Sequence, residues 1–142
     1  MQYSRRFSIG LVINPFAGIG GAVALKGSDG EQTRKKALAL GATPKANQRV
    51  STALRELKQL ADQVHFITAA GAMGADVLDA LGFSHDVVYQ PRAEQTEASD
   101  TQAAVTAIQQ HRPDVIVFAG GDGTARDVYT VVDSEQLVLG IP

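Results

Sequence analysis

The sequence contains no cysteine and no tryptophan, and aromatic residues make up only 6% of its 142 positions. The lack of thiols excludes disulfide frameworks, Cys-ligated zinc, iron–sulfur centres and thiol catalysis. Basic residues are not in excess, since 13 Lys and Arg stand against 15 Asp and Glu. A nucleic-acid-binding protein normally carries a basic face, so we expect no nucleic-acid partner.

Long hydrophobic runs are also missing. No apolar run approaches the ~18 residues that a membrane-spanning helix needs, so we expect no membrane partner. Arg5 and Arg6 followed by the apolar residues 7–13 imitate a secretory signal. Asn14-Pro15 ends that run after about seven residues, which is too early for a signal helix. We therefore predict a cytoplasmic protein.

Strand and helix patterns alternate along the chain. Apolar, β-branched runs predict strands at residues 8–13, 64–68, 86–89, 115–118 and 137–141. Helical spacing predicts helices at 50–61, 75–81, 99–111 and 125–132, and residues 31–41 are also helix-prone. Ser99 is expected to cap the third of these helices, with Gln102 reaching back to complete a capping box. This alternation predicts an α/β fold in which helices cover both faces of a parallel sheet, a Rossmann-like three-layer arrangement.

Two glycine-rich loops directly follow predicted strands, at Asn14–Gly21 and Gly120–Thr124. In parallel sheets, ligands bind beyond the carboxyl ends of the strands. The glycines at 120, 121 and 123 are expected to adopt positive φ and to approach a phosphate closely, while the following helix offers free amides. Alternatively, the second loop is only a tight turn and the first only a flexible surface loop. The first loop matches neither the dinucleotide-binding nor the Walker pattern.

Asp122, in the centre of the second loop, is the informative residue. A carboxylate repels phosphate unless it binds a metal ion or takes a proton from an attacking hydroxyl. Asp100 has two interpretations: it helps to order the nucleotide-binding loops, or it simply favours a helix N-terminus. The basic run 34–36 is either a solvated helix face or an anion site.

Other catalytic patterns are weaker. The three histidines, at positions 65, 85 and 111, lack metal-ligand spacing, so we predict no metal site built from protein ligands alone. Ser84, His85 and Asp86 are adjacent in sequence and cannot face one another as a catalytic triad.

The two loops together resemble a known family. Asn14-Pro15-x-Ala17-Gly18-x-Gly20-Gly21 after a first strand, with Gly120-Gly121-Asp122-Gly123-Thr124 later in the chain, resembles the NAD kinase and diacylglycerol kinase superfamily. The closest resemblance is to its ATP-NAD kinase-like subgroup of polyphosphate/ATP-dependent NAD kinases. Residues 25–30, 99–101 and 125–127 (Ala-Arg-Asp) also match this subgroup.

The resemblance implies a kinase that transfers a phosphoryl group from ATP or polyphosphate to the 2′-hydroxyl of NAD, giving NADP with the help of Mg²⁺. Residues 1–142 would form its nucleotide-binding domain, and a β-rich C-terminal domain that supplies much of the NAD site is expected to lie outside this chain. Asp122 would activate the ribose hydroxyl. The residues expected to bind the nucleotide substrates are Asn14, Pro15, Gly18, Gly20, Gly21, Gly120, Gly121, Gly123 and Thr124.

The identity of the acceptor stays open at this point. The Asn-Glu dipeptide that NAD kinases use on the adenosine ribose does not occur in these residues. A lipid or sphingoid kinase of the same superfamily, or a non-catalytic nucleotide-binding module that senses NAD or ATP, remain alternatives. From the resemblance we also expect a homo-oligomer in the full-length protein, and we interpret this chain, which stops on a predicted strand, as a fragment that folds but does not turn over alone.

Overall fold

The computed structural model describes residues 5–17, 45–93 and 96–142. Five parallel strands form one sheet: β1 (Phe7–Ile13), β2 (Val64–Ala69), β3 (His85–Tyr89), β4 (Val115–Ala119) and β5 (Val138–Ile141). Their order across the sheet is β3-β2-β1-β4-β5. All five predicted strands are present, and each differs from its predicted range by a single residue at one end.

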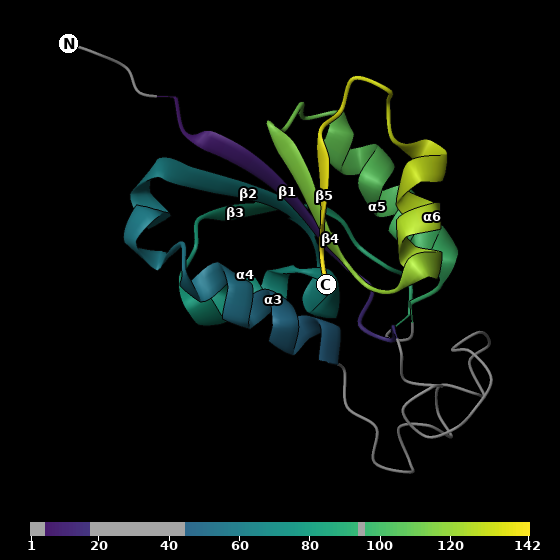
Figure 1. The fold of residues 1–142 in the computed structure, drawn as a ribbon, viewed down its shortest axis with the longest axis horizontal. Coiled ribbons are helices and arrows are strands. Elements are labelled where there is room, and N and C mark those ends of the chain that lie inside the picture. Colours follow the sequence, from purple (N-terminus) through teal and green to yellow (C-terminus); the bar gives the residue numbers. More distant parts are fainter. Residues whose placement is uncertain (1–4, 18–44, 94–95) are drawn as a thin grey trace.

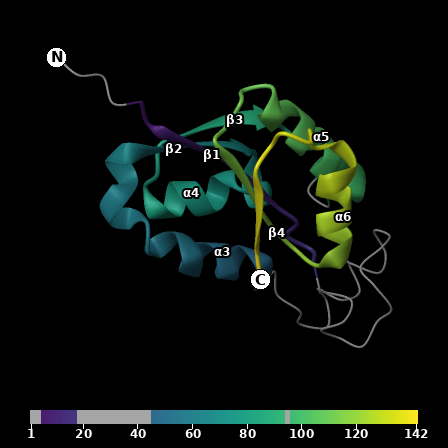
Figure 2. The same cartoon turned by 45° about the horizontal axis from the view of Figure 1, so that its top comes forward.

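Helices cover both faces of the sheet (Figure 1, Figure 2). One face carries α3 (Lys45–Arg55) and α4 (Ala75–Leu81), and the other carries α5 (Ala98–Gln109) and α6 (Asp122–Val131). Along the sequence, β2 and then β3 are added on one side of β1, and β4 and β5 are then added on its other side. Because right-handed crossovers are strongly preferred, this reversal of direction puts the later helices on the opposite face. The predicted α/β three-layer fold is confirmed.

Side chains of the central strand β1 alternate between two apolar layers. Leu11 and Ile13 pack toward α3 and α4, whereas Val12 packs toward α5 and α6. Gly10 lies on the same side as Val12, where an added methyl group would be 2.5 Å from Cγ2 of Ile108. Glycine at this position therefore lets α5 pack closely on the middle of the sheet.

The amino ends of β1 and β4 are tied together by Asp114. Its carboxylate accepts a hydrogen bond from the Ser8 amide at 2.7 Å and another from the Arg5 guanidinium, and its own amide donates to the Ser8 carbonyl at 2.8 Å. The bond from the Ser8 amide, followed by that from Arg5, holds the pKa of Asp114 below its usual value.

The predicted capping of the third helix by Ser99 is wrong. The helix α5 begins at Ala98 with Glu97 as its N-cap. The Glu97 carboxylate accepts from the Asp100 amide, and the Asp100 carboxylate accepts from the Glu97 amide at 2.8 Å. Two carboxylate side chains thus stand where a hydroxyl and an amide were predicted, and both lie at the helix N-terminus, where acidic side chains are favourable. Asp100 therefore acts at the helix N-terminus, as one of its two interpretations predicted.

The predicted helix at 50–61 is also two elements. The helix α3 starts earlier, at Lys45, and ends at Arg55, and a 3₁₀ helix follows at Lys58–Gln63. Val50 and Leu54 are buried as the spacing predicted, but Leu60 is 43% exposed. The tighter 3₁₀ winding has three residues per turn and takes Leu60 away from the face that the α-helical spacing indicated.

The third predicted helix, α5, ends at Gln109 rather than at His111. The helix predicted at residues 31–41 lies outside the described residues. Within the described ranges, no helix combines the length and the apolar character that crossing a membrane requires.

Candidate functional site

The strand order reverses between β1 and β4, the two strands that begin the two halves of the sheet. In open α/β sheets, such a switch point leaves a crevice beyond the carboxyl ends of the strands, because the chain leaves the two strands toward opposite faces. Asn14 directly follows β1, and Gly120 directly follows β4. The topology therefore brings the beginnings of both glycine-rich loops to the place where this kind of fold binds ligands.

Asn14 connects the two loops. Its amide donates to the carbonyl of Ala119 at 2.9 Å, which continues the pairing of β1 with β4. Its side-chain Nδ2 donates to Oγ1 of Thr124 at 3.0 Å, and its Oδ1 accepts from the Phe16 amide at 3.1 Å. One side chain thus fixes both the turn that follows β1 and the first turn of α6.

Gly120 and Thr124 pack against each other. Thr124 is buried, and an added methyl group on Gly120 would overlap its side chain. The Thr124 hydroxyl therefore faces Asn14 inside the molecule. We interpret Thr124 and Gly120 as residues that fix the shape of the loop. The residues between them, 121–123, lie on its solvent-exposed side.

Residues 121–123 form the open N-terminus of α6. Gly121 is the N-cap, Asp122 and Gly123 lie in the first turn, and all three are exposed. No side chain in the described part of the chain caps this helix, and no described side chain lies within 4 Å of a methyl group added at Gly121 or Gly123. The first amides of a helix have no partner within it and carry its positive dipole end, so they can bind an anion.

The prediction that this loop needs positive φ is wrong. Gly121 is extended, with φ −92°, and positive φ occurs instead at Gly71, Gly74 and Gly82 among the described glycines. The chain passes from β4 through one extended residue directly into α6, and an extended residue requires no left-handed conformation. The glycines of this loop therefore serve close packing at Gly120 and open space at the two following glycines.

The carboxylate of Asp122 is exposed at this helix N-terminus and has no hydrogen-bond or ion-pair partner among the described residues. Pro15 is buried in the turn after β1, and its contact with a nucleotide stays a prediction. The other predicted nucleotide-binding residues, Gly18, Gly20 and Gly21, lie outside the described residues, as does the basic run 34–36.

A constellation that the sequence reasoning missed lies at the opposite edge of the sheet. His65 Nδ1 is 2.8 Å from the Ser84 hydroxyl, and its Nε2 is 2.9 Å from the Asp86 carboxylate. The Arg6 guanidinium donates to the same Ser84 hydroxyl at 3.1 Å. The pairing of β2 with β3 places residue 65 beside residues 84 and 86, which sequence spacing alone did not reveal. These bonds link the amino ends of two strands, far from the carboxyl ends where the loops meet.

The sequence reasoning also missed two hollows at the carboxyl edge of the sheet. A cavity of about 470 Å³ lies between the segments that follow β2 and β3, and another of about 500 Å³ lies between α3 and the end of β5. The positive φ of Gly71 belongs to the first of these segments. No motif marks either hollow, because each is lined by segments that are distant in sequence.

Comparison with known proteins gives one match. The family model of the ATP-NAD kinase N-terminal domain matches residues 9–142, which include both glycine-rich loops and the whole of β2 to β5. Neither the comparison with curated proteins nor the comparison with solved structures finds a match.

Proposed function

The chain belongs to the ATP-NAD kinase N-terminal domain family, and from this premise we propose that it is the nucleotide-binding domain of a kinase that phosphorylates the 2′-hydroxyl of NAD, giving NADP. ATP or polyphosphate is the proposed phosphoryl donor. The reaction moves the terminal phosphoryl group of the donor to the ribose oxygen and releases a proton from the hydroxyl.

One structural observation carries the proposal beyond the family match. The hydrogen bond from Asn14 to Thr124 joins the two loops at the switch point, and it does so beside the uncapped first turn of α6. An anionic phosphate chain is the ligand that such free helical amides favour. The open space at Gly121 and Gly123 lets phosphate oxygens approach the backbone there.

In this proposal Asp122 removes the proton from the attacking hydroxyl. A general base needs a side chain that can reach the substrate and is not engaged elsewhere. The exposed carboxylate of Asp122, which has no partner in the described part of the chain, meets both conditions. Phosphoryl transfer requires mainly positioning and charge stabilisation, so a loop that holds phosphates beside one free carboxylate suits the reaction.

The residues present also fit a substrate-bridged magnesium ion. No group of three or more His, Asp or Glu side chains that could hold a metal occurs among the described residues. Mg²⁺ is usually held by one or two carboxylates together with substrate phosphates, and Asp122 is a free carboxylate at the proposed phosphate site. When bound, the ion would neutralise charge on the transferring phosphoryl group.

The test is an assay of the full-length protein with NAD and Mg²⁺, using ATP in one series and polyphosphate in the other. NADP is measured through the absorbance of NADPH in a coupled dehydrogenase reaction. Sustained NADP formation supports the proposal, and the two series identify the donor. Phosphorylation of a lipid or sphingoid base in place of NAD, or nucleotide binding without turnover, would contradict it.

A further inference from the structure

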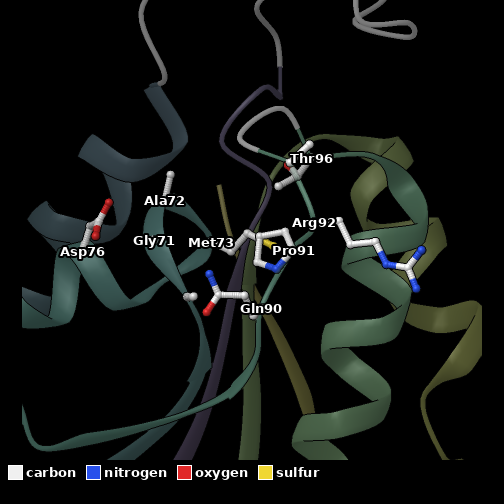
Figure 3. A pocket seen from close by; sticks show the side chains of 10 residues that line it. Gly71, Ala72, Met73, Asp76, Gln90, Pro91, Arg92 and Thr96 are labelled. Carbon is white, nitrogen blue, oxygen red and sulfur yellow. The ribbon is translucent and has the colours of Figure 1, made fainter.

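The cavity between the segments that follow β2 and β3 lies at the same edge of the sheet as the proposed phosphate site (Figure 3). Its lining comes from both segments and from the first turn of α4. The lining residues are Ala70, Gly71, Ala72, Met73, Asp76, Gln90, Pro91, Arg92, Ala93 and Thr96. A cavity of about 470 Å³ is within the usual size range of small-molecule sites.

Hydrogen bonds hold both walls of the cavity. On the β2 side, the Ala70 amide donates to the Tyr89 carbonyl at 2.8 Å, and the Ala72 carbonyl accepts from Asn47 Nδ2 at 2.7 Å. On the β3 side, the Tyr89 hydroxyl donates to Asp100 at 2.6 Å. This bond, together with burial and the charge of Asp100, raises the pKa of Tyr89 to about 12. The walls are therefore largely formed before any ligand binds.

The chemistry of the lining suits a flat, uncharged group. Met73 and Pro91 lie together at the centre of the cavity, and the amide of Gln90 lies beside them (Figure 3). Met73 is fully buried, and the partly exposed Pro91 ring offers apolar contact to an aromatic face. The side-chain amide of glutamine can donate to and accept from an adenine edge at the same time.

The charges of the lining balance. Asp76 and Arg92 lie on opposite flanks of the cavity and point away from each other (Figure 3). One carboxylate and one guanidinium do not make a site for a chain of phosphates, since the carboxylate repels it. A nucleoside, which has no net charge, suits this lining better than the phosphates that follow it.

The distance between the two sites fits a single nucleotide. The proposed phosphate site lies beyond the gap between β1 and β4, and the cavity lies beyond the gap between β2 and β3. These gaps are two strand spacings apart, which is about 10 Å. We propose that the cavity binds the adenosine of a nucleotide whose phosphates lie at the N-terminus of α6. This inference rests on the function proposed above.

The second hollow at this edge has a different character. Lys45 and Arg49 line it together with Ile141 and Pro142, and no Asp or Glu side chain does so among the described residues. Its two cations favour an anionic group over a nucleoside. Ala53 lines that hollow in the same way that Ala72 lines the adenosine cavity, and both alanines are exposed. The two positions therefore give a matched pair of substitutions.

The experiment measures binding to the full-length protein by calorimetry with three probes: ADP, NAD and inorganic tripolyphosphate. Ala72→Phe fills the adenosine cavity, and we expect it to raise the Kd of ADP or NAD about tenfold or more, with that of tripolyphosphate changed less than about twofold. Gln90→Ala removes one polar partner and should raise the same Kd about threefold to tenfold. Ala53→Phe is the control, and melting temperatures show that each variant folds.

The probes separate the possible results. If Ala72→Phe loses affinity for ADP alone, the cavity binds the phosphoryl donor, and if it loses affinity for NAD alone, the cavity binds the acceptor. Either result supports the inference. The inference fails, with the proposed function intact, if the wild type binds tripolyphosphate and ADP equally tightly, or if Ala53→Phe and not Ala72→Phe weakens ADP and NAD. If the wild type binds none of the three probes, both proposals fail.

Discussion

At the scale of single residues, the hydrogen bond from Asn14 to Thr124 spans 110 positions of the sequence. Thr124→Val keeps the shape of the side chain but leaves the part-buried side-chain Nδ2 of Asn14 without its acceptor. We therefore expect a loss of about 1–3 kcal/mol in the free energy of unfolding. Thr130 lies on the exposed side of the same helix, and Thr130→Val should change it by less than about 0.5 kcal/mol. Urea denaturation measures both variants, and equal effects would contradict the role assigned to Thr124.

Asp122 permits a sharper test of the chemistry. Asp122→Asn keeps the size of the side chain but removes the base, so kcat of the full-length enzyme should fall by a factor of about 10²–10⁴. The melting temperature should stay unchanged, because the carboxylate is exposed and has no described partner. Asp133→Asn, at another exposed aspartate, is the control. A kcat within about threefold of the wild type would contradict the assignment. A loss of apparent Mg²⁺ affinity that accompanies the fall in kcat would identify Asp122 as a metal ligand.

At the scale of elements, the close packing of α5 on β1 depends on Gly10. Gly10→Ala puts a methyl group against Ile108, and we expect it to cost about 1–3 kcal/mol of unfolding free energy. Gly121→Ala makes the same chemical change where no described side chain is within 4 Å and φ is negative, so stability should change by less than about 0.5 kcal/mol. Thermal unfolding of both variants tests this contrast. A stable Gly10→Ala protein would mean that α5 shifts without cost.

Element boundaries show what sequence patterns could and could not predict. The apolar run 115–118 predicted a buried strand, and β4 is there, because burial on both faces needs a continuous apolar run. The cap of α5 was missed because hydroxyl and carboxylate side chains at 97, 99 and 100 all suit a helix start, and only the backbone path selects Glu97. Leu60 was misplaced because α-helical and 3₁₀ turns share the i, i+3 spacing over a short segment.

At the scale of the whole molecule, the order of strands and helices predicted the fold class, and the position of two glycine clusters after strands predicted that both loops begin at the same end of the sheet. The bond between Asn14 and Thr124 and the cavity beside Met73 could not be predicted, because both depend on which strands become neighbours. Glycine content alone also did not distinguish Gly120, which makes room for Thr124, from Gly121, which faces open space.

The link between β1 and β4 at their amino ends gives the molecule a defined response to acid. The pKa of Asp114 is held below its usual value in the folded state, so its ionised form stabilises the fold at pH values above its unfolded pKa of about 3.9. That stability is lost as the pH falls through the lower folded pKa. Asp114→Asn should therefore reduce the free energy of unfolding at pH 7, and its difference from the wild type should shrink progressively below about pH 4.

Urea denaturation over a series of pH values measures this difference. Asp62→Asn, at an exposed aspartate of the 3₁₀ helix, is the control, and its curve should follow that of the wild type. A difference between Asp114→Asn and the wild type that stays constant down to the lowest pH would show that the bonds to Ser8 and Arg5 do not depend on the charge of the carboxylate.

The central place of β1 also determines when the switch point is completed during synthesis. β1 is synthesised before the other four described strands, yet its neighbours are residues 64–69 on one side and 115–119 on the other. At usual translation rates, roughly 5–20 seconds separate the synthesis of Ile13 from that of Val115. Throughout that interval the switch point has only one of its two loops. A nucleotide that binds there, as proposed above, would therefore stabilise the finished domain and would not guide the nascent chain toward it.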